Sequence, residues 1–109
     1  MISWDRVNEL KSEVGEEDFA EVVEIFLEEM DESMVELRAI PPDGELGSAM
    51  HFVKGAAMNL GFDELGSICQ VYETMADDGQ TDQIDCAKVI ACYENSKAEF
   101  INNATKMAA

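Results

Sequence analysis

Apolar residues recur every three to four positions through most of this chain, a spacing that places them on one face of an α-helix. The clearest stretch runs from Phe19 to Leu37, where an apolar face covers about five turns and the opposite face is strongly acidic. Proline and glycine mark the boundaries, because proline cannot continue a helix and glycine commonly ends one. By residue number, helices are predicted over about 3–14, 19–40, 45–60, 63–76 and 81–101, with fraying from 102 onward.

The ends of these helices carry recognisable signals. Ser3 or Asp5 is expected to cap the first helix, and Asp63 is expected to cap the fourth. Pro41 and Pro42 are expected to end the second helix and to begin a tight loop over 41–45. A turn is predicted at 77–79, and the last helix is expected to start near residue 81 or 82.

Four amphipathic helices joined by short loops pack most simply as an up-down-up-down bundle. The sequence therefore predicts an all-α fold, a four-helix bundle with a short additional N-terminal helix that covers one end. The chain has 109 residues, of which 47% are hydrophobic, enough for one modest core. We expect residues 1–109 to form a single domain, and a monomer, because no apolar face is left over.

The charge of the chain excludes several classes of function. The net charge is −17, from 24 acidic and 7 basic residues, so no basic face for DNA or RNA can be assembled. Anionic membrane surfaces are disfavoured for the same reason, and no apolar run approaches the length of a membrane span. The first residues lack the basic start and apolar block of a signal peptide, which predicts a cytoplasmic protein.

No metal site and no cofactor site is predicted. Cys69, Cys86 and Cys92 form no Cys-x-x-Cys pair, and with a single histidine they indicate core residues, not a zinc site. The acidic face of the second helix lacks the Glu-x-x-His spacing of di-iron bundles. The acidic turn at 77–79 fits a calcium loop poorly.

Residues 49–61 contain the only histidine of the chain, His51. On a helix it lies outside the apolar stripe, and the residues on its own face are Gly47, Lys54, Gly55 and Met58. A glycine inside a helix costs roughly 1 kcal/mol relative to alanine, so two glycines beside an exposed histidine suggest that something large approaches the ring. Periodicity alone leaves two interpretations open. One is a nucleophilic imidazole that receives a phosphoryl group from a macromolecular partner, and the other is a surface histidine without a function.

The run from His51 to Gly61 resembles the signature of histidine-containing phosphotransfer (HPt) domains. That signature reads His, any residue, an apolar residue, Lys, Gly, two small residues, two variable residues, an apolar residue and Gly, and every constrained position is matched. Downstream, Leu65, Cys69 and the pair Tyr72–Glu73 stand where the family has Leu, an apolar residue or Cys, and Leu-Glu. Tyr72 in place of Leu is a departure that concerns local packing.

The resemblance implies a function for this chain. HPt domains accept a phosphoryl group on histidine, usually at Nε2, from the phospho-aspartate of a response-regulator receiver domain, and pass it to another receiver. The implied phosphoacceptor is His51, and Lys54 would stabilise the phosphoryl group. The implied partners are receiver domains and a hybrid or other sensor histidine kinase. Mg²⁺ would sit in the receiver, and this chain would need no cofactor of its own.

Other residues near His51 receive more local roles. Gly55 would leave room for the partner, and Gly47 lies on the same face. An apolar docking patch around His51 is expected to draw on Met50, Phe52 and Met58, with packing between the helices as the open alternative for some of them. Glu73 occupies the glutamate of the family's Leu-Glu pair, and a carboxylate there would hold Nδ1–H and leave Nε2 free. A structural role for Glu73 is the open alternative.

The sequence favours a stoichiometric carrier over an enzyme, because it has no Gly-rich nucleotide loop, no Lys/Asp set for ATP and no second histidine. Two alternatives remain open. One is a phosphoacceptor module, either of a larger chemotaxis-type kinase or isolated from a hybrid kinase, and the other is a non-catalytic acidic adaptor. The initiator-like Met1 and the absence of a linker favour a stand-alone carrier. The intact Lys54–Gly55 pair argues against the adaptor, since a decayed site has no need of a helix-weakening glycine.

Overall fold

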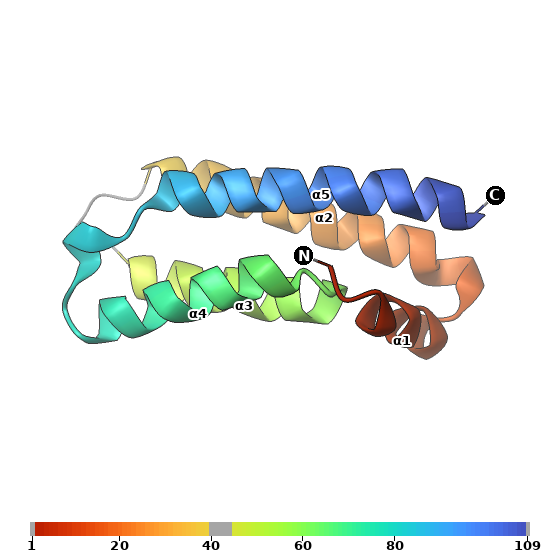
Figure 1. Ribbon diagram of the computed structural model, residues 1–109, viewed down its shortest axis with the longest axis horizontal. Coiled ribbons are helices and arrows are strands. Elements are labelled where there is room, and N and C mark those ends of the chain that lie inside the picture. Colours follow the sequence, from red (N-terminus) through yellow and green to blue (C-terminus); the bar gives the residue numbers. More distant parts are fainter. Residues whose placement is uncertain (1, 40–44, 109) are drawn as a thin grey trace.

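The computed structural model describes residues 2–39 and 45–108, and helices account for most of them (Figure 1). In chain order the elements are α1 (Trp4–Val14), α2 (Glu16–Ala39), α3 (Leu46–Leu60), α4 (Asp63–Asp77), the short 3₁₀ helix η1 (Thr81–Gln83) and α5 (Cys86–Ala108). Helices α2 to α5 alternate in direction, each packs against the next, and α5 closes against α2 (Figure 1). The prediction of an all-α, up-down-up-down four-helix bundle with an extra N-terminal helix is confirmed.

Local capping explains where several helices begin and end. The Ser3 side chain accepts a hydrogen bond from the backbone N–H of Arg6 at 3.3 Å, so Ser3 and not Asp5 caps α1. Gly61 ends α3 in the left-handed conformation at φ 85°, which glycine adopts without steric cost. Asp63 does not cap α4 as expected, because it is already the first helical residue and Phe62 occupies the cap position.

The last helix differs most from its prediction. Residues 81–83 form the separate turn η1, and extended backbone at Ile84 divides it from α5. The Asp85 side chain then accepts a hydrogen bond from the N–H of Ala87 at 3.1 Å, which fixes the start of α5. Fraying from residue 102 is also wrong, since α5 continues to Ala108 in a stretch without glycine or proline. The predicted proline stop and most of the 41–45 loop lie outside the described residues.

The core lies between the four long helices, and α1 covers the end at which α3 turns into α4 (Figure 1). Trp4 stacks on Phe100 with 5.7 Å between ring centroids, and Phe62 packs against Phe100 at the same distance. The backbone N–H of Ser3 donates to the carbonyl of Gly61 at 2.7 Å, which ties the N-terminal segment to the α3–α4 turn. The fully buried side chains include Met30, Met50, Leu60, Phe62, Leu65 and Tyr93.

A polar contact joins α5 to α2. The Tyr93 hydroxyl donates to Asp31 at 2.7 Å, and the Lys97 ammonium lies 3.0 Å from the same carboxylate, so α5 is fastened to α2. Burial raises the pKa of the Tyr93 phenol far above its usual range, and the hydrogen bond to Asp31 adds to this effect. None of the described helices is both long and apolar enough to cross a membrane.

Candidate functional site

His51 lies in the middle of α3 with 72% of its side chain exposed, as its position outside the apolar stripe predicted. Its Nδ1 atom is 2.5 Å from an oxygen of Glu73, which projects from α4. The two helices approach closely here, because a Cβ atom on Gly47 would lie only 3.3 Å from the Cβ of Ala76. Gly47 therefore allows the helix contact that brings Glu73 to the imidazole.

The second oxygen of Glu73 binds Lys54. The Lys54 ammonium is 2.5 Å from Glu73 Oε1 and 3.1 Å from the amide oxygen of Gln70. The side chains of Lys54 and Glu73 are 18% and 16% exposed, so this ion pair is largely covered, whereas the imidazole beside it is open to solvent. One carboxylate thus bridges a partly buried cation and an exposed imidazole.

The charge on Glu73 decides the tautomer of His51. The hydrogen bond from Lys54 holds the pKa of the Glu73 carboxyl below its usual value against the opposing effect of burial, and the hydrogen bond with His51 adds to the lowering. An ionised carboxylate accepts hydrogen bonds and donates none, so the proton between the two groups belongs to Nδ1. In the neutral imidazole, Nε2 then carries the lone pair. The structure leaves a nucleophilic nitrogen on the exposed ring.

Two residues that the sequence analysis did not single out complete this set of contacts. Gln70 donates from its amide nitrogen to the Thr74 hydroxyl at 3.3 Å, and Thr74 donates to the Gln70 carbonyl at 3.1 Å. The available signal was spacing, since Gln70 precedes Glu73 by three positions and so shares its face of α4.

The residues expected to face a partner separate into two groups. Phe52 and Met58 are 51% and 58% exposed, and a Cβ atom on Gly55 would meet nothing within 4 Å. Met50 is a correction, since it is completely buried between the helices and cannot belong to a docking patch. The reason is geometric: position 50 precedes Val53 by three residues and turns inward with it.

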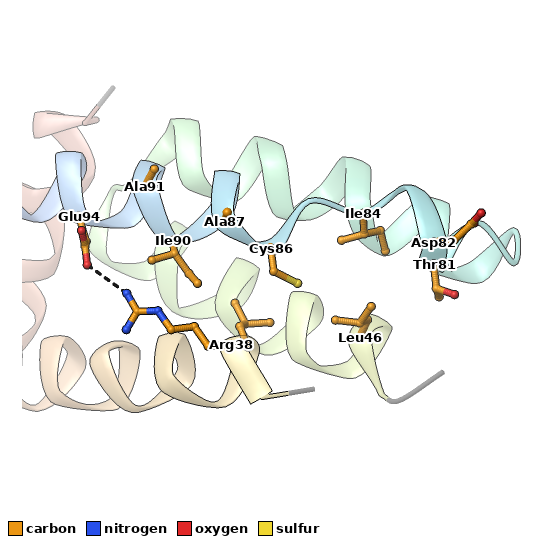
Figure 2. A pocket seen from close by; sticks show the side chains of 11 residues that line it. Arg38, Leu46, Thr81, Asp82, Ile84, Cys86, Ala87, Ile90, Ala91 and Glu94 are labelled. Atoms are coloured by element: carbon orange, nitrogen blue, oxygen red, sulfur yellow. Dashed lines mark ion pairs between the residues drawn. The ribbon is translucent and has the colours of Figure 1, made fainter. Parts of the chain in front are cut away.

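The hollow beside His51 can be compared with the apolar hollow at the other side of α3 as a place for chemistry. The first, of about 490 Å³, lies directly beside His51, between Gly47 and Glu73. The other, of about 570 Å³, lies where α2, α3, η1 and α5 meet, and its walls are mainly apolar (Figure 2).

The described residues that line the second hollow offer no comparable chemistry. Arg38 and Glu94 pair at 3.6 Å along its edge, and its one thiol is that of Cys86 (Figure 2). Burial raises the pKa of Cys86, so the thiol stays protonated and is a weak nucleophile. Across residues 2–39 and 45–108, no three His, Cys, Asp or Glu side chains gather in a way that would hold a metal ion. The surface at His51 is the candidate site.

Comparison with models of protein families identifies a match for most of the chain. The family model described as Hpt domain matches residues 21–99, a range that includes most of α2, all of α3 and α4, and the greater part of α5. The searches of curated proteins and of solved structures found nothing that matches this chain.

Proposed function

The chain belongs to the Hpt domain family, whose members are phosphocarrier modules of histidine phosphotransfer in phosphorelays, and from this premise we propose a specific route. His51 accepts a phosphoryl group from the phospho-aspartate of a response-regulator receiver domain and passes it to a second receiver. A sensor histidine kinase, hybrid or otherwise, stands at the head of the relay. The observation that carries the proposal is an exposed imidazole whose Nδ1–H is held by an ionised carboxylate.

The transfer step uses the free lone pair on Nε2. The lone pair attacks the phosphorus atom of the acyl phosphate, a P–N bond forms, and the P–O bond breaks with its electron pair leaving on the aspartate of the partner. The ring keeps its proton on Nδ1 and gains positive charge. The Glu73 carboxylate, 2.5 Å from that nitrogen, stabilises this charge. Transfer to the second receiver is the reverse of this step.

The neighbouring residues assist the approach and the charge. In the proposal, the Lys54 ammonium neutralises the phosphoryl oxygens, Gly55 admits the partner, and Phe52 and Met58 contribute apolar contacts beside His51. Mg²⁺ bound by the partner receiver supplies further charge neutralisation, and this chain acts as a stoichiometric carrier without a cofactor of its own. The cytoplasmic location and monomeric state expected from the sequence belong to the same proposal.

The first test is transfer of label from a phosphorylated receiver domain in the presence of Mg²⁺. Wild type should become labelled with the acid lability and base stability of phosphohistidine, and His51→Gln should remain unlabelled while keeping its helical circular dichroism. Lys54→Ala should slow labelling roughly 10- to 100-fold, the range expected when one hydrogen bond to a charged group is lost. Label on folded His51→Gln, or none on folded wild type from several receivers, would overturn the proposal.

A further inference from the structure

The contacts of Lys54 continue away from His51 as a chain with a fixed direction. A lysine ammonium only donates hydrogen bonds, so the oxygen of the Gln70 amide faces it and the nitrogen of that amide faces Thr74. The Thr74 hydroxyl donates its hydrogen bond to the backbone carbonyl of Gln70, so its oxygen can accept a hydrogen bond from the side-chain amide nitrogen of Gln70. Both ends of the Gln70 side-chain amide are fixed in this way. Within this series of three hydrogen bonds, each donor faces an acceptor.

Gln70 gives the Lys54 ammonium a second, uncharged acceptor. A free lysine side chain has many rotamers, and fixing it in one of them costs conformational entropy that each added contact helps to offset. Two acceptors one turn apart on α4, Gln70 and Glu73, confine the ammonium to one place. Because Gln70 carries no charge, it attracts the ammonium less strongly than a second carboxylate would, so the ammonium can leave it more easily to reach a phosphoryl oxygen.

We propose that Gln70, oriented by Thr74, is a positioning residue that holds the Lys54 ammonium beside the imidazole in readiness for the incoming phosphoryl group. This inference rests on the proposed function and adds to it two residues of α4 that do not touch the reacting atoms. Gln70 acts through Lys54, so its effect must depend on the presence of Lys54. That dependence separates a positioning role from an ordinary hydrogen bond on the surface of α4.

The kinetic test compares rates of transfer from one phosphorylated receiver. Gln70→Leu should slow transfer roughly three- to tenfold, as expected for the loss of one hydrogen bond that orders a charged group. Thr74→Val, which removes only the partner of the amide, should have a smaller effect in the same direction. Asn95→Leu is the matched control, an amide replaced by leucine at an exposed position on α5, and should transfer at the wild-type rate.

A double-mutant cycle supplies the decisive comparison. In a Lys54→Met background, Gln70→Leu should cause no further loss, because no ammonium remains to be positioned. An equal slowing by Gln70→Leu with and without Lys54 would overturn the inference, as would an unchanged rate in Gln70→Leu. In both cases labelling of wild type on His51 would leave the proposed function standing.

A second measurement does not require transfer. In wild type the two Hε protons of Lys54 should have separate NMR chemical shifts, because the side chain is held in one conformation, and in Gln70→Leu they should merge. Shifts that stay separate in Gln70→Leu overturn the inference whatever the kinetics show. If wild type takes no label, the proposed function falls, and the role of Gln70 in holding Lys54 is still decided by this comparison.

Discussion

Glu73 divides its two oxygens between the imidazole of His51 and the ammonium of Lys54, and this sharing sets the chemistry of the site. The carboxylate selects the tautomer of the ring and also pairs with the ammonium that, in the proposed function, neutralises the phosphoryl oxygens. Under that proposal, phosphorylation of His51 places negative charge near Lys54 and positive charge on the ring, so we expect Lys54 to move toward the phosphoryl group while Glu73 pairs with His51 alone. The resting contacts would then already match the charges of the product.

Glu73→Gln tests this arrangement at the scale of one residue. The amide can still accept from Nδ1–H, but it carries no charge, so we expect a mixed population of imidazole tautomers and slower transfer. The ¹⁵N chemical shifts of the His51 ring would show the tautomers directly. A ring that keeps its proton on Nδ1 as fully as in wild type would mean that the charge of Glu73 does not select the tautomer.

The effect of Glu73→Gln on the free energy of unfolding should depend on pH. The pKa of Glu73 is lowered in the folded state, so its contacts contribute stability above the unfolded-state pKa of roughly 4.3, and the contribution is lost as the pH falls through the lower folded value. Urea unfolding should therefore show wild type more stable than Glu73→Gln at neutral pH, with the gap closing in acid below that value. A stability difference between wild type and Glu73→Gln that is equally large at neutral and at acid pH would contradict the lowered pKa of Glu73.

The sequence could predict which side chains of a single helix are exposed, but not the contacts that depend on how two helices pack together. The exposure of His51 and the open space at Gly55 follow from helical spacing alone. Met50 was placed in the docking patch because the inward face of α3 is wider than the stripe of residues first assigned to it. Gln70 was missed because its contact with Lys54 requires the register between α3 and α4, which no single-helix pattern contains.

At the scale of elements, α3 carries two glycines with opposite surroundings. A Cβ atom at Gly47 would press against Ala76 on α4, whereas a Cβ atom at Gly55 would meet nothing within 4 Å. Gly47 is therefore explained by the packing of α3 on α4. Gly55 weakens the helix without any packing reason, and the explanation we propose for it is the approach of a partner.

Gly55→Gln should separate stability from function. Glutamine favours the helix over glycine, so the free energy of unfolding should rise by about 0.5–1 kcal/mol, while the larger side chain should block the receiver and nearly abolish transfer. Urea unfolding and receiver-dependent labelling measure the two effects. Gly47→Gln is the comparison and should lower stability through its clash with α4. Transfer that remains unchanged in Gly55→Gln would remove the close-approach argument.

The elements themselves were predictable to different degrees. Helical spacing predicted the bodies of α1 to α4, because each has a wide apolar face, although α2 begins at Glu16, three residues before its predicted start. The beginning of α5 was not predictable from periodicity, since the turn η1 and the cap at Asp85 depend on local hydrogen bonds in a polar stretch.

At the scale of the whole molecule, the net charge of −17 works against the compact state. Much of it lies on the exposed face of α2, where carboxylates repel one another across solvent. Salt screens such repulsion, with a Debye length of about 10 Å at 0.1 M and about 3 Å at 1 M. We expect the Tm to rise by a few degrees on going from low to moderate NaCl concentration.

Calorimetry or thermal circular dichroism at several NaCl concentrations tests the salt prediction, with a neutral osmolyte as the control for non-ionic effects. A Tm that falls with added salt would mean that ion pairs such as Lys97–Asp31 and Lys54–Glu73 outweigh the repulsion.

The up-down-up-down topology itself was predictable from the short connections, because helices joined by a few residues must run antiparallel as neighbours.

The side-chain contacts of His51 and Lys54 described above join one pair of consecutive helices, α3 and α4. His51 and Glu73 are 22 positions apart in the sequence, whereas the Tyr93–Asp31 contact that joins α5 to α2 spans 62. Contacts of short range in sequence form quickly and with little loss of chain entropy. The His51–Glu73 contact thus lies within one helix hairpin, while α3 and α4 still pack on α2 and α5 through the common core. Substitutions at the α2–α5 seam that leave this core intact can change the stability of the bundle without removing any side chain that contacts His51 or Lys54.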